Sequence, residues 1–445
     1  MATCATPVVP QRVLPSYSVE EQEEQRMKRS IFQTQFQLNQ MKEEKKVYEN
    51  QVSAAKEIVA SLKDRTKVIT LVLGNTQSGK TGVMVSLLNQ IMEDDELNQT
   101  PVDNICVLTA LSSVEWDKQT KQRFPECIHK QIFHLPSLKK KFLPYVKDKK
   151  DVLVLIDEAQ YGAKSSQTIH KVFDELRYVD LSTMCDKNIR IVMFTATPSG
   201  INYDLNDWGV HATRVFLKEG EGYTSAKNLL EMGNLRQYKN LCGINMKGEN
   251  TCTPEELEEN LTELRNAVYS FEEPRYHFIR ISTRGIMKTT LRRNIKRTFG
   301  DSVNYVNYSM KNKMKDINEL LSVKPDKHTI IYIMERLRCA KTIVKQFIGV
   351  MVERHTHSLI NDEVVVQGVR LTGYDYNGDA IMFTNIESTD KFSLLRATGF
   401  QGSAVEWNSS TTRNTGKEKI LKVVPTFISR NKADNKADNK EVKEN

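Results

Sequence analysis

Short, fully apolar runs alternate with helical patterns through the first half of the chain. Four of these runs lie at 68–73, 104–108, 152–156 and 189–194, and each has the length of one buried strand. Apolar strands that alternate with helices are typical of a parallel sheet that is covered on both faces. The pattern therefore predicts an α/β lobe over residues 47–201.

A second strand-rich region follows a polar, irregular stretch at 202–273, which we expect to connect two lobes. Its apolar runs lie at 277–281, 304–307, 329–333 and 380–384. These runs predict a second α/β lobe with a parallel sheet over residues 274–425.

The two ends of the chain differ from the lobes. Residues 1–15 lack periodicity, and residues 18–46 combine many charges with apolar positions at broadly helical spacing. We therefore expect residues 1–46 to form an N-terminal arm that is partly disordered and partly helical. The last segment, 426–445, is charged and repeats Lys-Ala-Asp-Asn, which predicts a disordered tail.

Composition argues against membrane and secreted proteins. The 445 residues are 39% hydrophobic, and their apolar runs are far shorter than the roughly 18 residues of a membrane helix. The start of the chain has no continuous apolar stretch, so we expect no secretory signal. Seven scattered cysteines without a Cys-x-x-Cys pair favour an intracellular, reducing compartment, either cytoplasm or nucleus. A net charge of +8 suits a polyanionic partner.

The clearest candidate for chemistry is a phosphate-binding loop that follows the first apolar run. The sequence at 74–81 fits G-x-x-x-x-G-K-[ST], with an apolar strand before it and a helical run after it. The loop consists of Gly74, Asn75, Thr76, Gln77, Ser78, Gly79, Lys80 and Thr81. Its backbone N–H groups would surround a phosphate of ATP, Lys80 would reach the β- and γ-phosphates, and the Thr81 hydroxyl would bind Mg²⁺. The alternative is a glycine-rich turn that caps a helix.

An acidic pair follows the third apolar run. Asp157 at the carboxyl end of a buried strand can hold the Mg²⁺ shell, and Glu158 beside it can act as the general base for an attacking water. An acidic pair alone is more often the start of a loop. Together with the phosphate-binding loop, it predicts a nucleoside triphosphate site.

The sequence Asp-Glu-Ala-Gln at 157–160 resembles the D-E-A-x box of superfamily 2 (DEAD/DEAH-like) helicases. The next strand ends in Thr-Ala-Thr-Pro at 195–198, which is similar to the third motif of that superfamily. The resemblance covers residues 50 to 200 and implies two RecA-like lobes with ATP and Mg²⁺ in the cleft between them. It also implies that Thr195 and Thr197 couple the phosphate site to nucleic acid.

Three other positions in the first lobe resemble the superfamily more loosely. Gln51 lies where many of these helicases place a glutamine that reads adenine, and the alternative is a solvent-facing glutamine. Thr109 lies in a segment similar to a motif that contacts the nucleic-acid backbone, and Arg123 follows it. Trp116 is a candidate platform for base stacking, although a single Trp on a helix is more often packed core.

The second lobe carries further candidate nucleic-acid contacts. Ser282 and Arg284 follow an apolar strand, as backbone-binding residues do in the superfamily. Lys288, Arg292 and Lys296 continue the spacing of four residues, so they form one basic stripe that either tracks phosphates or is a solvated helix face. Arg338 follows the strand at 330–334, which is similar in position to the fifth motif.

The last motif departs from the family pattern Q-x-x-G-R-x-x-R. The sequence Gln-Gly-Val-Arg-Leu-Thr-Gly-Tyr at 367–374 has one residue too few between glutamine and arginine, and Tyr374 replaces the second arginine. Gln367 and Arg370 remain the candidates for sensing the γ-phosphate and neutralising charge in the transition state. This stretch and Glu-Trp-Asn-Ser at 406–409 resemble divergent helicase-like proteins of large DNA viruses, which adds a viral replication site to the expected compartments.

The motifs together predict an ATP-dependent nucleic-acid helicase or translocase. ATP and Mg²⁺ are the expected ligands, and DNA or RNA is the expected partner. One alternative is a P-loop nucleotide kinase, which needs the same loop and acidic strand end. The other is a nucleic-acid-binding scaffold that has kept a degenerate helicase fold without turnover.

Overall fold

The computed structural model describes most of the chain and groups it into two compact units. The described residues are 17–97, 100–109, 114–159, 168–196, 205, 208–282, 285–309, 316–334, 336–337, 342–355, 370–399, 410–412 and 420–422. The expected disordered tail at 426–445 and residues 1–16 lie outside this set. The chain passes from the first unit to the second between Gly220 and Glu221.

The described part of the N-terminal arm is one long helix, α1 (Val19–Gln40), which confirms the helical prediction. Ser18 and Glu21 form a capping box at its start, so two backbone N–H groups of the first turn have partners. The side chains of Phe32 and Phe36 are buried, while the rest of the helix is largely exposed. The helix is therefore anchored along one face only.

The first unit contains a parallel sheet of six strands. In chain order these strands are β1 (Ile69–Leu73), β2 (Ile105–Thr109), β3 (Ile132–Phe133), β4 (Leu153–Asp157), β5 (Arg190–Thr195) and β6 (Ala212–Phe216). Their order in the sheet is β3-β2-β4-β5-β1-β6, and every pair is parallel. All residues of the central strands β1, β2 and β4 are buried, as their apolar sequences predict.

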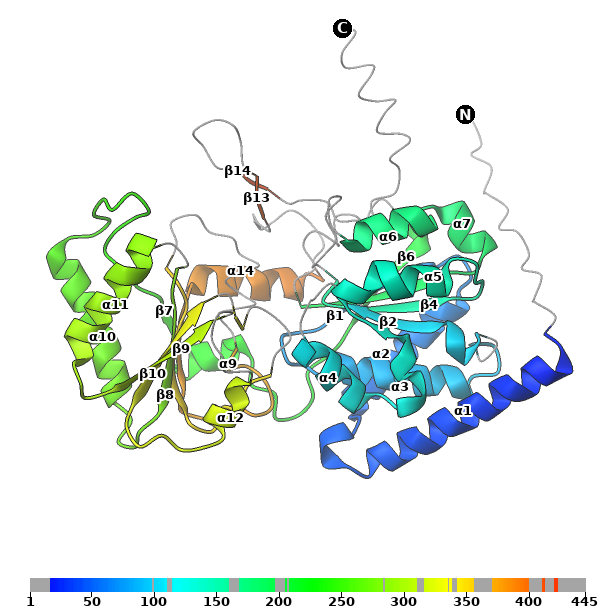
Figure 1. Cartoon of the computed structure of the whole chain (residues 1–445), viewed down its shortest axis with the longest axis horizontal. Helices are drawn as coiled ribbons and strands as arrows, with labels where there is room; N and C mark the ends of the chain where they lie inside the picture. Colours follow the sequence, from blue (N-terminus) through cyan, green and yellow to red (C-terminus); the bar gives the residue numbers. More distant parts are fainter. Residues whose placement is uncertain are drawn as a thin grey trace, which may run out of the picture. The chain divides into compact units, whose positions relative to one another are not determined.

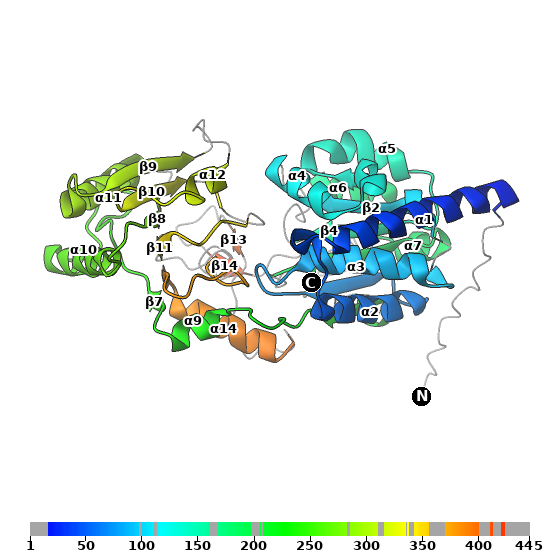
Figure 2. The same cartoon turned by 90° about the horizontal axis from the view of Figure 1, so that it is seen from below.

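Helices cover both faces of this sheet. They are α2 (Glu49–Lys63), α3 (Lys80–Glu93), α4 (Val114–Arg123), α5 (Leu143–Val146), α6 (Thr168–Leu176) and α7 (Leu181–Asp186). In Figures 1 and 2, α2, α3 and α4 lie on one face of the sheet and α6 and α7 on the other. This division follows from right-handed crossovers, because the strand order turns back after β3.

The second unit contains another parallel sheet of six strands. These are β7 (Leu235–Gln237), β8 (Tyr276–Arg280), β9 (Asn304–Ser309), β10 (Thr329–Met334), β11 (Ile348–Val352) and β12 (Ile381–Thr384). Their order is β7-β12-β11-β8-β10-β9, again with parallel pairs. The prediction of two α/β lobes with parallel sheets is confirmed.

The helices of the second unit also pack on both faces of their sheet. They are α9 (Ala226–Glu231), α10 (Pro254–Tyr269), α11 (Gly285–Phe299), α12 (Ile317–Leu321) and α14 (Ile386–Ala397). One buried cluster joins α10 and α11 to the sheet, and a second joins α9 and α12 to it. A short antiparallel pair, β13 (Ser410–Thr412) and β14 (Ile420–Lys422), follows α14.

The expected connector at 202–273 contributes to both sheets. It includes β6, which pairs with β1, and β7, which pairs with β12. Both are edge strands, and their sequences mix polar and apolar residues. The lobe boundaries drawn from the sequence stay a prediction.

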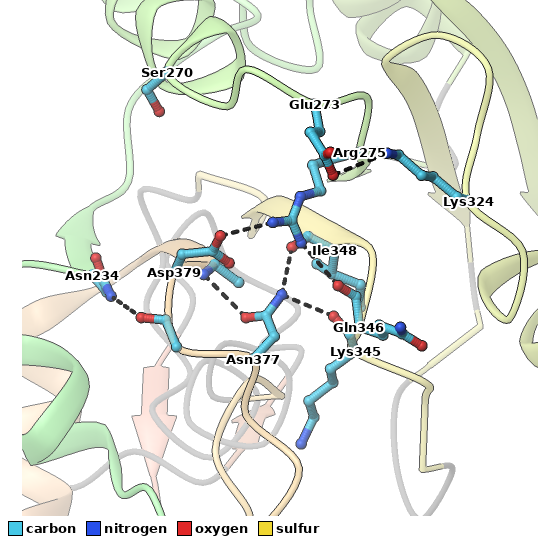
Figure 3. A network of polar contacts seen from close by, with 12 residues as sticks. Asn234, Ser270, Glu273, Arg275, Lys324, Lys345, Gln346, Ile348, Asn377 and Asp379 are labelled. Carbon is cyan, nitrogen blue, oxygen red and sulfur yellow. Dashed lines mark hydrogen bonds and ion pairs between the residues drawn. The ribbon is translucent and has the colours of Figure 1, made fainter.

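A polar network ties together the loops at the amino edge of the second sheet (Figure 3). The guanidinium of Arg275 donates to the carbonyl of Gln346 and to the carboxylate of Asp379, both at 2.8 Å. The Asn377 amide donates to the carbonyls of Lys345 and Ile348, each at 2.9 Å. These bonds fix the loops that precede β8, β11 and β12.

Candidate nucleotide site

The phosphate-binding loop joins β1 to α3 at the carboxyl edge of the first sheet. Gly79 has a φ of +90°, a left-handed conformation that glycine adopts without strain, and α3 begins at the next residue. The ammonium of Lys80 turns back over the loop and donates to the carbonyl of Asn75 at 3.1 Å. The strand, loop and helix predicted from the sequence are all present, and the amino end of a 14-residue helix suits a phosphate.

Gln51 packs directly against this loop. It is 2% exposed, and its Oε1 accepts the N–H of Tyr48 at 3.1 Å, which caps α2. A Cβ on Gly79 would lie 2.2 Å from Nε2 of Gln51, and a Cβ on Gly82 would lie 2.1 Å from Oε1. The alternative of a solvent-facing glutamine is therefore wrong, because the two glycines leave room for this amide. Reading of adenine by Gln51 stays a prediction.

The Asp157 carboxylate lies at the carboxyl end of β4 and is held on both oxygens. Its Oδ2 accepts the indole N–H of Trp116 at 2.7 Å, and its Oδ1 accepts the backbone N–H of Glu158 at 3.1 Å. Burial and, next, the Glu158 carboxylate raise the pKa of Asp157 to about 6, although the Trp116 N–H and the Lys80 ammonium act to lower it. A cation bound there would oppose both effects and favour the ionised carboxylate, which is the form that binds Mg²⁺.

Glu158 follows in a left-handed conformation, with a φ of +51°. A non-glycine residue there stores strain of about 1–3 kcal/mol, and such strain is concentrated at functional sites. The next residue, Ala159, donates its backbone N–H to the carbonyl of Phe194 in β5 at 3.1 Å. The loop after β4 is thus tied to the neighbouring strand.

Backbone bonds bring three of the sequence motifs to one edge of the sheet. Gly74 donates its N–H to the carbonyl of Thr195 at 3.2 Å, so the phosphate-binding loop is joined to the end of β5. In the strand register Leu73 pairs with Thr195, and Thr109 pairs with Asp157. Lys80, the acidic pair and Thr195 therefore share the carboxyl edge of three adjacent strands, β4, β5 and β1.

The candidate nucleic-acid residues of the first unit are in different surroundings. Thr109 and Thr195 are fully buried at the ends of β2 and β5. Arg123, at the end of α4, donates to the carbonyl of Glu44, and burial lowers its pKa. Trp116 is 4% exposed, which excludes it as a stacking platform in this structure and supports the interpretation of Trp116 as packed core.

Four candidates cannot be placed. Thr197, Arg284, Arg338 and Gln367 lie outside the described residues. Their roles stay predictions.

In the second unit, Ser282 and Arg370 are both buried. The Arg370 Nε donates to the carbonyl of Leu337 at 2.9 Å. The function assigned to Arg370 from the sequence stays a prediction.

The basic stripe on α11 is occupied by contacts within the second unit. The Arg292 guanidinium lies 5.1 Å from the ring centre of Tyr332 and bonds to Asn307. Lys296 pairs with Asp301 and lies 5.0 Å from the ring centre of Tyr305. These exposed contacts are weak enough to exchange for phosphates, so neither interpretation of the stripe is decided.

The sequence motifs do not predict a buried ion pair in the second unit. Arg280 ends β8 and Glu353 follows β11, and their side chains meet at 2.9 Å. The two Nη atoms of Arg280 also donate to the carbonyls of Arg336 and Leu337, at 2.9 and 3.0 Å. A charged residue at the end of an otherwise apolar strand is the signal that would have drawn attention to Arg280.

A surface hollow of about 810 Å³ lies elsewhere in the second unit. Arg236 and glutamates of α10 line it, and no motif residue does. The motif residues, rather than this hollow, define the candidate site. Among the described residues, no helix has the length and apolar character of a membrane span, and no cluster of three His, Cys, Asp or Glu side chains is arranged to hold a metal.

Comparison with known proteins gives one relative by sequence and several by structure. No family model matches the chain. An uncharacterised protein of Acanthamoeba polyphaga mimivirus is 26% identical over 344 residues, which cover 69% of this chain and 78% of that protein. The sequence relative thus comes from a virus.

Three solved structures illustrate the likeness in fold. The Escherichia coli DEAH/RHA helicase HrpB has a TM-score of 0.45 at 10% identity over 76% of this chain and 43% of its own. S. cerevisiae Dbp5 bound to RNA and ADP BeF3 has a TM-score of 0.40 at 11% identity, over 80% and 93%. The NS3-like helicase from Alongshan virus has a TM-score of 0.35 at 10% identity, over 74% and 80%.

This chain spans less than half of the HrpB chain that it matches. At these identities the likeness concerns the fold. The solved structures to which the chain is similar include superfamily 2 helicases.

Proposed function

We propose that this chain is a helicase-like ATPase that couples ATP hydrolysis to movement on, or remodelling of, DNA or RNA. One observation carries the proposal. Lys80, Asp157 and Glu158 lie at the carboxyl edge of one parallel sheet, and backbone bonds from Gly74 and Ala159 tie their loops to the strand between them. Phosphoryl transfer needs a cationic side chain that can bind phosphates, here Lys80, and a buried pair of carboxylates, here Asp157 and Glu158.

The residues of this edge fit Mg²⁺. Asp157 and the Thr81 hydroxyl offer oxygen ligands, which Mg²⁺ prefers, and each carboxylate oxygen of Asp157 keeps a lone pair beyond its one hydrogen bond. Bound Mg²⁺ would neutralise charge on the phosphates. Lys80 would hold the β- and γ-phosphates, and the backbone from Gly74 to Gly79 would surround them.

Glu158 has the role of general base in this proposal. Its carboxylate would accept a hydrogen bond from the attacking water and orient that water toward the γ-phosphate. Gln51 would contact the base of the nucleotide, while Gln367 and Arg370 would meet the γ-phosphate. Thr195 and Thr197 would couple this site to nucleic acid.

The nucleic-acid path is proposed from the sequence resemblance. It would include Thr109 and Arg123 from the lobe at 47–201, and Ser282, Arg284 and Arg338 from the lobe at 274–425. Both lobes would be RecA-like, with the arm before them and the segment at 202–273 between them in sequence. The last motif departs from the family pattern in the spacing of Gln367 and Arg370 and in the tyrosine at position 374.

Two alternatives remain distinguishable by experiment. A P-loop nucleotide kinase would transfer phosphate to a small acceptor and would not respond to nucleic acid. A scaffold that has lost turnover would bind nucleic acid without hydrolysing ATP. The Thr-Ala-Thr-Pro sequence at 195–198 and the second α/β lobe favour the ATPase, because a kinase needs neither of them.

The test is an ATPase titration with single-stranded DNA, duplex DNA and RNA at several salt concentrations. We expect stimulation by a polynucleotide that weakens as salt rises, because phosphate contacts release counterions. Lys80→Ala and Glu158→Gln should each lower the rate by about 10²–10⁴-fold, and Arg370→Ala by about 10³–10⁵-fold. Lys67→Ala is the matched control, since half-buried Lys67 precedes β1 at the opposite edge of the sheet, where its ammonium donates to the carbonyl of Val210. Equal rates in all five proteins, wild type included, would reject the assignment.

A further inference from the structure

Trp116 makes one polar contact that its burial alone does not explain. It lies on α4, is 4% exposed, and its indole Nε1 donates to Oδ2 of Asp157 at 2.7 Å. This distance is at the short end for an N–H donor on a carboxylate, as in a charge-assisted hydrogen bond. The largest side chain of α4 is thus bound to the acidic residue that ends β4.

The fold brings these two residues together although Trp116 lies on the helix after β2 and Asp157 lies at the end of β4. Strand β2 pairs with β4 so that Thr109, the last residue of β2, lies opposite Asp157. Helix α4 begins five residues after Thr109, and Trp116 lies in its first turn. The indole therefore reaches Asp157 from the side of β2, while the Glu158 N–H bonds to the other oxygen.

Two donors on two oxygens restrict rotation of the carboxylate. Without the indole, the side chain of Asp157 could turn about its Cβ–Cγ bond and keep only the bond to the Glu158 N–H. With the indole bond in place, the remaining lone pairs of the Asp157 oxygens point in fixed directions. Hydrogen bonds of this kind to a metal-binding side chain are usually worth about 10–100-fold in metal affinity.

We propose that Trp116 is a positioning residue, whose indole N–H orients the Asp157 carboxylate for a divalent cation bound with the nucleotide. This inference rests on the proposed function, because it requires a cation at Asp157. The ring itself does not meet nucleic acid or substrate. A Trp that only filled the core would affect stability and leave cation affinity unchanged.

The central variant is Trp116→Phe, which keeps an aromatic ring and removes the N–H donor. The probe is Mn²⁺ with a non-hydrolysable ATP analogue, and free Mn²⁺ is measured by electron paramagnetic resonance. We expect the affinity for Mn²⁺ in this complex to fall by about 10-fold. Trp208→Phe is the matched control, because Trp208 is fully buried in the same unit and the same atoms are removed. Its Mn²⁺ affinity should equal that of the wild type.

The ATPase assay adds a second readout. Trp116→Phe should need about 10-fold more Mg²⁺ for half-maximal rate, while the rate at saturating Mg²⁺ stays within about 3-fold of wild type. A purely structural role would lower the rate at every Mg²⁺ concentration. That pattern, or wild-type Mn²⁺ affinity in Trp116→Phe, would overturn the inference.

A third measurement uses the protein without any change at Trp116. The chain has three tryptophans, so ¹⁵N-labelled indoles give few NMR signals. The Trp116 indole signal should move in Asp157→Asn, because the acceptor loses its charge, and it should move again when Mg²⁺ and nucleotide bind to the wild type. An unmoved signal in both experiments would exclude the bond.

The binding experiment separates the two proposals. If the wild type binds no Mn²⁺–nucleotide complex, the proposed function fails as well. If the wild type binds the complex and a folded Trp116→Phe binds it equally, only the role of Trp116 is rejected.

Discussion

The two units place buried charges at the carboxyl ends of their strands, but they satisfy these charges differently. In the second unit Arg280 meets Glu353 at 2.9 Å, and its remaining donors bond to backbone carbonyls. In the first unit both oxygens of Asp157 accept hydrogen bonds from uncharged donors. A buried charge with its own counter-ion holds a fold together, whereas a buried carboxylate bound by neutral donors retains affinity for a cation.

The largest expected effect is on the ion pair of the second unit. Arg280→Ala should lower the free energy of unfolding by about 3–5 kcal/mol, because Glu353 is left as a buried charge without its partner. Urea unfolding measures this change. Replacing both residues, Arg280→Met with Glu353→Leu, should restore most of the stability, and a loss under about 1 kcal/mol in Arg280→Ala would show that the pair is not structural.

A second prediction concerns pH and His277, near the amino edge of the second sheet. Burial, the nearby His328 and Arg275 lower the pKa of His277 to about 3, and its Nε2 lies 2.9 Å from Nδ1 of His328. Below the ordinary His pKa of 6.5, His277 is protonated in the unfolded chain but stays neutral in the folded chain. The free energy of unfolding should therefore fall as pH drops from about 6.5 toward 3.

The loss should reach about 3 kcal/mol near pH 4. Unfolding free energies at several pH values in wild type and His277→Gln measure it, since the variant lacks this titration. Parallel curves for the two proteins would contradict the assignment to His277.

The third prediction concerns the acidic pair of the first unit without metal. The pKa of Asp157 is raised, so the folded chain holds a proton more tightly than the unfolded chain, and stability should fall as pH rises from about 4 through 6. Relative to Asp157→Asn, the wild type should lose about 2 kcal/mol between pH 4 and 7. Exposed Asp148→Asn is the control, and relative to it the wild type should show no such loss. A gain by the wild type would contradict a raised pKa.

The smallest expected effect concerns the space beside the phosphate loop. Gly82→Ala should cost about 1–2 kcal/mol, because the added methyl meets the amide of Gln51. Gln51→Ala should relieve this strain, so the double variant should be more stable than Gly82→Ala alone. Thermal unfolding of the three variants decides this, and strict additivity of the two changes would argue against the contact.

The fold was largely predictable where the pattern of apolar residues within one segment is enough to identify a strand. The strands at 68–73 and 152–156 are fully apolar because both of their faces are buried, and the structure places β1 and β4 there. Edge strands β6 and β7 escaped prediction because one side of each faces away from the sheet, and polar residues are tolerated there. In β11, Gly349 interrupts the apolar pattern, since a Cβ there would lie 2.7 Å from Cε1 of His277.

The candidate site was predictable only in part. Consecutive residues form the phosphate loop, so its spacing alone identifies it. Contacts across the chain leave no such pattern: Trp116 is 41 positions from Asp157, and Arg280 is 73 positions from Glu353. The burial of Gln51 depends on Gly79, just before α3, and on Gly82 within α3, and periodicity in its own helix does not reveal this.

The bond from Gly74 to Thr195 consists of main-chain atoms only. Every amino acid supplies the carbonyl at position 195, and every one except proline supplies the N–H at position 74. The link between these two loops therefore tolerates most substitutions at either position, and divergent relatives of this chain can lose recognisable motif residues and keep the two loops joined.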